Sequence, residues 1–338
     1  MRRERRRGFT LVELLVVIGI IGILMAILLP ALSKARESSN TIKCSSNLRS
    51  IGLGFNQYLA ENKQTFPPAY TYRPGPGWSG PSDQYPNPTY GYQHWSSFIY
   101  GAAITGAAAD AFKCPSLEQG GLPPTNPKPG GFDEGQVNDP DFNAGSEPDA
   151  QVARCAYTVN EAIMPRNKFN PSVRGASTSR LMQYTYVKAS SVRNGAQVVL
   201  ATEFWPDWHI ISEVGGEDTP VVKSHRPVSG YQPIIGKKTT DLVDGVVQAS
   251  ASKLSHVRVT SVTNPIKVGS GVSNTLGWIG RNHGSSKRGP KGEDLRKSNF
   301  LYLDGHVETK TIEETLKPNF EWGDRLKIYS LPGARVVP

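Results

Sequence analysis

The chain has 338 residues, 34 Gly, 26 Pro and a formal net charge of +9 at pH 7, with only 20% of its residues charged. This composition is typical of a loop-rich protein that also contains strands. Residues 1–8 carry five Arg and one Glu, so the rest of the chain is only mildly basic. No basic stripe interleaved with aromatic residues is present, so we expect no nucleic-acid partner. No Gly-x-Ser-x-Gly motif and no Gly-rich phosphate loop before a helix is present either, so we expect a protein that is not an enzyme.

An apolar segment, residues 9–29, follows these basic residues and is interrupted only by Thr10 and Glu13. At a rise of ~1.5 Å per residue it forms a helix of roughly 30 Å, long enough to cross a hydrocarbon core. The arginines before it predict a cytoplasmic N-terminus and an extracytoplasmic remainder. The segment is too long for a cleaved signal peptide, and no Ala-x-Ala-like site follows it. A charge within a membrane is costly, so we expect Glu13 to have a functional partner.

The sequence Gly-Phe-Thr-Leu-Val-Glu-Leu-Leu-Val-Val-Ile-Gly-Ile-Ile-Gly-Ile-Leu, which begins at Gly8, resembles the class III signal of type IV prepilins and type II secretion pseudopilins. The resemblance implies that a prepilin peptidase cuts after Gly8 and methylates the new N-terminal Phe9. It also implies that Glu13 meets the N-terminal amine of a neighbouring subunit's Phe9, because pairing opposite charges in lipid offsets much of their desolvation. Other pilin or pseudopilin subunits are then its partners. The expected location is the inner membrane, as a single-pass protein with a periplasmic C-terminal domain, and afterwards a pilus-like filament.

The amphipathic continuation of the helix, residues 30–62, begins at Pro30, where a kink is tolerated at the membrane exit. Its apolar residues recur at spacings of three and four, which puts them on one helix face that we expect to pack against a sheet. They are Cys44, Leu48, Ile51, Phe55 and Leu59. The expected organisation is a removed leader (1–8), a transmembrane helix (9–29), the amphipathic helix (30–62) and an extracytoplasmic globular domain (63–338).

Short segments in the rest of the chain resemble, in order, a subgroup of prepilin-like proteins with a large C-terminal domain ending in a His…Asp-Gly signature. These segments are residues 43–58, 112–116, 156–160, 196–203, 281–284 and 299–307. The resemblance implies a pilin-like α+β fold, with the long N-terminal helix packed on an antiparallel sheet. The Pro/Gly-rich stretches 71–91 and 119–150 cannot sustain a helix or a central strand, so we expect long surface loops there.

Five runs are expected to form strands: residues 153–163, 183–190, 197–204, 299–303 and 306–311. The last two flank Asp304-Gly305, a signal for a hairpin closed by a type I′ turn. Residues 95–100 are expected to form a short helix with Ser96 or Ser97 near its start.

His283, Asp304 and His306 are the candidate metal ligands. A divalent cation accepts His and carboxylate ligands, and the resemblance to pseudopilins implies calcium as the candidate ion. A basic insertion, residues 285–298, separates His283 from Asp304 and weakens this interpretation. We therefore favour a structural role, with Asp304 as a turn residue and His283 as a hydrogen-bonding anchor for the hairpin, and expect no cofactor.

The three cysteines, Cys44, Cys114 and Cys155, allow one disulfide in an oxidising envelope compartment. The sequence alone does not fix the pair. Cys44 lies on the apolar helix stripe, where a buried thiol is as reasonable as a disulfide. The favoured candidate pair is therefore Cys114–Cys155.

The expected function is structural, as a subunit of a type II secretion pseudopilus or a type IV pilus-like filament. The alternative is a membrane-anchored envelope protein that binds polysaccharide and does not polymerise. Trp205, Trp208, Tyr184 and Tyr186 would supply its sugar-stacking platform, although aromatic residues in strands are more often core. A metal-dependent envelope enzyme is a third, weaker possibility.

Overall fold

The structure is a computed structural model. It describes residues 11–72, 91–101, 106–126, 133, 147–165, 186–207, 213–214, 220–221, 224, 226–233, 242–243, 246–247, 253–256, 275–284, 289, 294–323 and 335–337. Gly8 and Phe9 therefore lie outside the described residues, as do most of the two predicted loops.

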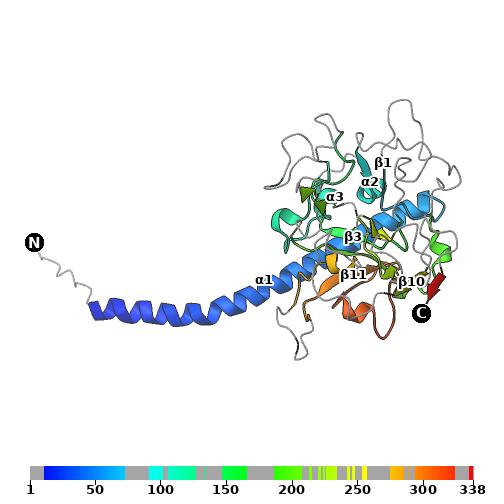
Figure 1. The fold of residues 1–338 in the computed structure, drawn as a ribbon. Helices are drawn as coiled ribbons and strands as arrows, with labels where there is room; N and C mark the ends of the chain where they lie inside the picture. Colours follow the sequence, from blue (N-terminus) through cyan, green and yellow to red (C-terminus); the bar gives the residue numbers. More distant parts are fainter. Residues whose placement is uncertain are drawn as a thin grey trace, which may run out of the picture.

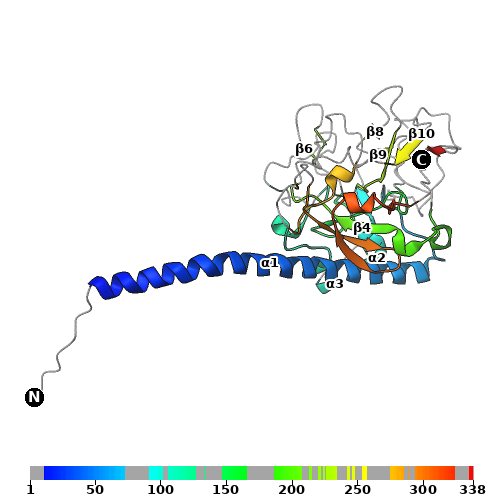
Figure 2. The same ribbon diagram turned by 90° about the horizontal axis from the view of Figure 1, so that it is seen from below.

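Helix α1 (Leu11–Glu61) is unbroken over 51 residues and continues through Pro30. Its first half projects from the globular body, and its second half lies against that body (Figures 1 and 2). The large apolar side chains between Leu11 and Leu32 are 45–77% exposed, so no other part of the described protein covers them. Among the described residues α1 is the one helix long and apolar enough to cross a membrane. The predicted long N-terminal helix is confirmed.

The second half of α1 buries the predicted stripe. Cys44, Leu48 and Ile51 are 0% exposed, and Phe55 and Leu59 are at most 7% exposed. Burying a side chain of this size stabilises the fold by roughly 1.5–3 kcal/mol, so the stripe fastens the helix to the rest of the core.

A neighbouring helix can approach α1 closely at Gly54, because this residue has no side chain. A Cβ there would lie 2.7 Å from the ring of Tyr100, closer than side-chain atoms can pack. Tyr100 belongs to α2 (Trp95–Tyr100), and its hydroxyl donates a hydrogen bond of 2.7 Å to the carbonyl oxygen of Ser50 on α1. Trp95 of the same short helix stacks on Phe55, with ring centroids 5.5 Å apart. Helix α2 thus covers α1 beside the sheet.

The main sheet has four antiparallel strands in the order β12-β11-β4-β3. They are β3 (Tyr157–Val159), β4 (Val199–Glu203), β11 (Ser298–Tyr302) and β12 (Val307–Lys310). The C-terminal hairpin β11–β12 thus pairs with β4, a strand that lies about a hundred residues earlier in the chain. Figure 2 shows α1 running along one side of the body, next to this sheet. The predicted α+β arrangement is confirmed.

The sheet has a core on each face, because successive residues of β11 point to opposite sides. Leu301 joins the cluster that contains the α1 stripe. Its neighbours Phe300 and Tyr302 join a second cluster with Trp278 and Trp322. The β11 strand is consequently buried along its whole length.

The smaller elements lie around this sheet. The further short helices are α3 (Ala107–Asp110), η2 (Glu118–Gly120), η4 (Ala189–Ser191), η5 (Gly195–Gln197), η8 (Leu276–Trp278) and η9 (Glu313–Thr315). A second sheet has the order β13-β10-β7, and three two-stranded ladders complete the described strands. The strands of this second sheet are β7 (Tyr231–Pro233), β10 (Lys253–His256) and β13 (Arg335–Val337). The three ladders are β1 (Tyr70–Tyr72) with β2 (Tyr92–His94), β5 (Glu213–Val214) with β6 (Pro220–Val221), and β8 (Leu242–Val243) with β9 (Val246–Val247). The β10–β13 pair is parallel.

The predicted C-terminal hairpin forms, but the predicted type I′ turn is wrong. Its loop has three residues, because the Tyr302 N–H donates to the His306 carbonyl at 2.9 Å and the Gly305 N–H donates to the Tyr302 carbonyl at 3.0 Å. Only Gly305 has a positive φ, +93°, whereas a type I′ turn needs two such residues. Leu303 and Asp304 therefore occupy the centre of a type I-like turn, and Gly305 supplies the left-handed residue that follows it.

One other local prediction needs correction. In the described part of the predicted strand 183–190, Lys188 forms only an isolated bridge with Thr65 before the chain enters η4. The predicted short helix at residues 95–100 is confirmed as α2, with Ser96 and Ser97 in its first turn, and His94 caps it because its Nδ1 accepts from the Ser96 N–H.

Replacing Gly305 by Ala should lower the free energy of unfolding by about 1–2 kcal/mol, the cost of a left-handed conformation for a residue with Cβ. There is space for the methyl group, since the nearest atom would be 4.0 Å away, so the backbone alone carries the cost. Gly305→Asn should lose less, because Asn tolerates this conformation. Chemical denaturation of the full chain in detergent measures both.

The matched control is Gly195→Ala beside the same hairpin, where the new Cβ would lie an ordinary 3.5 Å from Leu303 Cβ. This change should stay within about 0.5 kcal/mol. Equal losses at the two glycines would contradict the proposed turn geometry.

Candidate functional site

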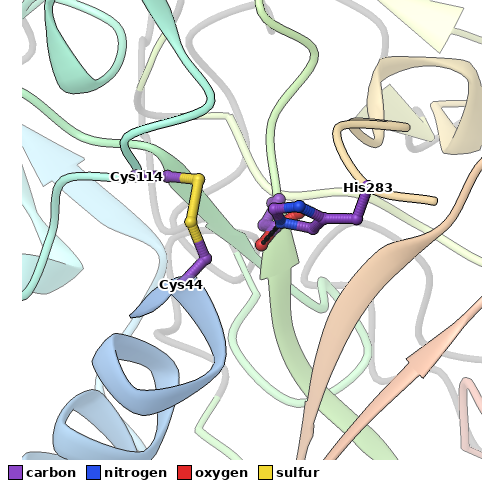
Figure 3. A group of neighbouring side chains, drawn as sticks. Cys44, Cys114 and His283 are labelled. Atoms are coloured by element: carbon purple, nitrogen blue, oxygen red, sulfur yellow. Dashed lines mark hydrogen bonds and ion pairs between the residues drawn. A yellow bond between two sulfur atoms is a disulfide. The ribbon is translucent and has the colours of Figure 1, made fainter. Parts of the chain in front are cut away.

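Four segments far apart in the sequence bring their polar side chains to one buried cluster, which we call the buried centre. Cys44 comes from α1, Cys114 from the loop after α3, Glu203 from the end of β4 and His283 from the chain after η8. One possible ligand atom from each of the four lies within 4.8 Å of the others. All four residues are at most 1% exposed. Figure 3 shows the two cysteines opposite the imidazole of His283.

The structure joins Cys44 to Cys114 by a disulfide, with their Cα atoms 5.2 Å apart. The predicted pair Cys114–Cys155 is therefore wrong. That prediction assumed that packing on the helix stripe and disulfide formation exclude each other at Cys44. They do not, because the stripe faces the loop that carries Cys114. The bond closes a separation of 70 residues and ties α1 to the globular part.

Cys155 is the remaining thiol, and it is fully buried. It donates to the Tyr157 carbonyl at 3.1 Å. Burial raises the pKa of this thiol to about 12, although the Tyr157 hydrogen bond acts in the opposite direction. Since thiolate is the reactive form, Cys155 is a poor partner for disulfide exchange.

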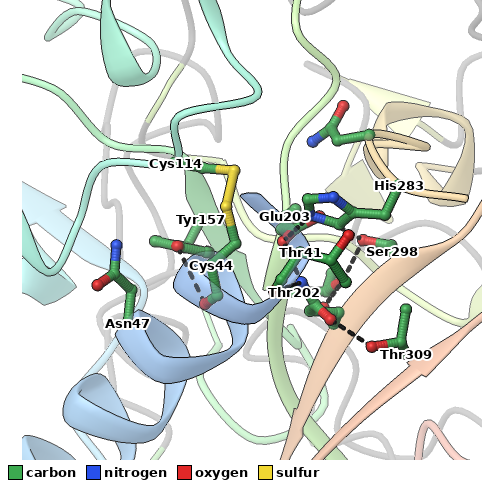
Figure 4. A network of polar contacts seen from close by, with 12 residues as sticks. Thr41, Cys44, Asn47, Cys114, Tyr157, Thr202, Glu203, His283, Ser298 and Thr309 are labelled. Carbon is green, nitrogen blue, oxygen red and sulfur yellow. Dashed lines mark hydrogen bonds and ion pairs between the residues drawn. A yellow bond between two sulfur atoms is a disulfide. The ribbon is translucent and has the colours of Figure 1, made fainter. Parts of the chain in front are cut away.

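Glu203 and His283 form a buried pair next to the disulfide. His283 Nε2 lies 2.9 Å from Glu203 Oε1. Two residues of β11 donate to the same carboxylate: Asn299 Nδ2 to Oε1 at 2.9 Å and Ser298 Oγ to Oε2 at 3.3 Å. Figure 4 shows this network between the disulfide and the hairpin. The charge of Glu203 is thus compensated by hydrogen bonds as well as by the imidazole.

His283 lies between two carboxylates. Its Nδ1 is 3.5 Å from Glu37 Oε1 on α1, longer than an ordinary N–H···O hydrogen bond. Glu37 Oε1 also accepts from the Gly284 N–H at 3.2 Å. Burial lowers the pKa of His283, but the hydrogen bond and charge of Glu203, together with the charge of Glu37, outweigh burial and raise it overall.

The predicted ligands His283, Asp304 and His306 do not come together. Among the described residues, the group around His283 includes neither Asp304 nor His306. These two form their own partly exposed pair at the hairpin loop, with Asp304 Oδ1 2.5 Å from His306 Nδ1. The His306 ring stacks on Tyr302, with centroids 4.3 Å apart. Asp304 therefore acts within the turn, and His283 is hydrogen-bonded to Glu203 rather than to the turn.

Glu203 is the functional candidate that sequence reasoning missed. Its signal was present, because each of the four residues of the buried centre stands in a different one of the short motifs that follow in order along the chain. A carboxylate at the end of a strand that begins with Val-Leu-Ala was a second signal.

The predicted sugar-stacking platform is partly outside the described residues, since neither Tyr184 nor Trp208 is described. Trp205 is half-buried, and the guanidinium groups of Arg281 and Arg296 lie 5.4 and 5.0 Å from its ring centroid. Cation–π contacts of this kind use the aromatic face that a sugar would need.

Peptide mapping of the purified protein without reduction should find the Cys44 and Cys114 peptides linked and Cys155 as a free thiol. The expectation follows from the positions of the three sulfur atoms in the fold. Alkylation of the denatured, unreduced chain should label Cys155 alone. A linked pair that contains Cys155 would contradict the structure of the buried centre.

Comparison with known proteins identifies a known motif in the N-terminal segment. A family model described as the prokaryotic N-terminal methylation motif matches residues 3–29. The type II secretion system core protein G of Klebsiella michiganensis is 34% identical over 64 residues, which are 19% of this chain and 45% of that protein. The chain thus matches less than half the length of this relative. No solved structure matches the chain.

The family-model match falls on the same part of the molecule as the uncovered apolar half of α1. The motif spans residues 3–29, and the exposed apolar side chains extend from Leu11 to Leu32. The protein is therefore a prepilin-like protein, with an N-terminal methylation motif on a long apolar helix and an α+β body behind it.

Proposed function

We propose that this chain is a structural subunit of a type II secretion pseudopilus or a type IV pilus-like filament. The observation that carries the proposal is the first half of α1, which bears the methylation motif and exposes its apolar side chains along its whole length. Such a surface is stable when lipid or other apolar helices cover it. Lipid would cover it before assembly, and the helices of neighbouring subunits would cover it in a filament.

Processing and location follow from the same proposal. A prepilin peptidase would cut after Gly8 and methylate Phe9, leaving the arginine-rich leader behind. The protein would wait in the inner membrane as a single-pass protein, with its N-terminus in the cytoplasm and its body outside. The relative named as a core protein of type II secretion supports this assignment over that of an enzyme.

The second half of α1 suits a filament subunit mechanically. It is fixed to the body by the buried stripe, by the Tyr100–Ser50 hydrogen bond and by the Cys44–Cys114 disulfide. A force applied to the apolar half would therefore reach the body through one continuous helix. A flexible linker at this place would let the body swing relative to the filament axis.

The assembly test is Glu13→Val. Glu13 lies in the first turn of α1 and is the one charged residue between Phe9 and Leu29. Removing its carboxylate should not impair insertion, because valine is more stable in lipid by a few kcal/mol. The amount of this subunit in sheared filament fractions should nevertheless fall at least about tenfold, the effect of losing about 1.4 kcal/mol per subunit contact.

The matched control is Leu14→Val, an apolar change one position further along the helix. It should insert and assemble like the wild type. If Glu13→Val enters filaments as well as this control does, Glu13 is not the partner of a neighbouring subunit's amine.

Processing is tested by Gly8→Leu, since a bulky side chain at this position should obstruct the peptidase. Mass spectrometry of the wild-type N-terminus should find methylated Phe9, and the variant should keep its leader. A membrane-resident wild-type protein that begins at Met1 or Arg2 would contradict the proposed processing.

A further inference from the structure

The buried centre contains more chemistry than a structural disulfide uses. A disulfide is neutral and needs no ionisable neighbours, yet Glu203 is 0% exposed and His283 is 1% exposed beside it. Burying a carboxylate and an imidazole costs several kcal/mol of desolvation, which their mutual attraction only partly offsets. Apolar side chains would pack against the disulfide without this cost. The four side chains therefore call for a second explanation.

The donor set itself suggests one. Two cysteine sulfurs, one imidazole nitrogen and one carboxylate oxygen are the three ligand types that zinc accepts, in the number that a closed tetrahedral site needs. The sulfur atoms favour zinc over magnesium or calcium, which prefer oxygen ligands. Cys155 is not part of the set, because the group within 4.8 Å contains only the two cysteines of the disulfide.

The distances are compatible with this chemistry. Zinc bonds of about 2.3 Å to sulfur and about 2.0–2.1 Å to nitrogen or oxygen put tetrahedral ligand atoms about 3.3–3.8 Å apart. The four ligand atoms already lie within 4.8 Å of one another. His283 Nε2 and Glu203 Oε1, now 2.9 Å apart, would separate slightly, and the two sulfurs would separate once their bond is absent. These shifts require side-chain rotation at the four positions.

The surrounding residues match the outer shell of a zinc site. A ligating imidazole usually donates its other N–H to a carboxylate, and Glu37 Oε1 lies 3.5 Å from His283 Nδ1. A ligating carboxylate is usually hydrogen-bonded as well, and Asn299 and Ser298 donate to Glu203. These contacts orient two of the four ligands before any ion binds.

We propose that the thiol form of this protein binds one zinc ion through Cys44, Cys114, Glu203 and His283. Zinc and the disulfide are then two alternative ways of cross-linking Cys44 to Cys114. Either one joins α1 to the loop after α3, and zinc would add the end of β4 and the segment after η8. The proposal does not depend on assembly into a filament.

The two forms interconvert with a balanced change. Binding of zinc to the two thiols releases two protons and forms two zinc–thiolate bonds. Oxidation by a disulfide acceptor removes two electrons from the two thiolates and forms the Cys44–Cys114 bond. The acceptor takes up these electrons and two protons to become a dithiol, and Zn²⁺ leaves.

The test uses the full chain in detergent, reduced with a water-soluble phosphine, desalted without oxygen and mixed with zinc. After gel filtration, elemental analysis should find one zinc per chain. At zinc concentrations well above the dissociation constant, the melting temperature of the reduced chain should be about 5 °C higher than without zinc. The oxidised chain should retain no zinc, because it has no thiolate. Cobalt in place of zinc should give the thiolate-to-metal charge-transfer band of a tetrahedral site.

Variants separate the four ligands from other metal-binding groups. Glu203→Gln and His283→Gln should each weaken zinc binding at least about tenfold. The melting curve of each oxidised variant shows whether it folds independently of metal. The matched controls are Cys155→Ser, which keeps a donor to the Tyr157 carbonyl, and His306→Asn at the exposed hairpin pair; both should bind zinc like the wild type.

Three results would overturn the proposal. The first is a reduced chain that stays folded and retains no zinc. The second is a chain that unfolds on reduction and is not restored by zinc. The third is unchanged zinc binding in Glu203→Gln or His283→Gln, or its loss in Cys155→Ser, because the ion would then lie elsewhere.

Discussion

One helix has to satisfy two different surroundings, and the rest of the structure depends on this constraint. The first half of α1 exposes apolar side chains on all sides, whereas the second half buries a single stripe from Cys44 to Leu59. The helix is continuous between them, through Pro30. Because the helix is continuous, its second half runs in the direction that the first half sets. The main sheet therefore has to pack one of its faces against a helix whose direction is already fixed. Strand β11 meets this need by contributing Leu301 to the α1 side and Phe300 to the opposite core.

The buried centre strengthens the same contact from inside. It joins α1 to a loop through a disulfide and places a Glu–His pair next to that bond. Such a pair is weak support for stability, because desolvation opposes its attraction. Its hydrogen bonds to Asn299 and Ser298 nevertheless link the centre to the C-terminal hairpin. Zinc binding to the thiol form gives these polar residues a chemical role that packing alone does not.

Much of the fold was predictable from local patterns. The 3.6-residue period placed the buried face of α1, and Asp304-Gly305 located the hairpin. The turn type was wrong because the same dipeptide also fits a three-residue loop, where Leu303 and Asp304 form the turn and only Gly305 has positive φ. The cysteine pair and the contact between Glu203 and His283 could not be predicted, since both depend on which distant segments meet. Motif order indicated which segments matter, but not that Cys44, Cys114, Glu203 and His283 share one site.

The central claim is that the second half of α1 is part of the core of the body rather than a linker to it. Hydrogen exchange of the full chain in detergent, followed by mass spectrometry, tests this directly. The account predicts that backbone amides of residues 44–59 exchange as slowly as those of β11, residues 298–302, because both open only when the common core unfolds. Exchange of residues 44–59 more than about a hundredfold faster than that of β11, a difference of about 2.7 kcal/mol, would contradict it.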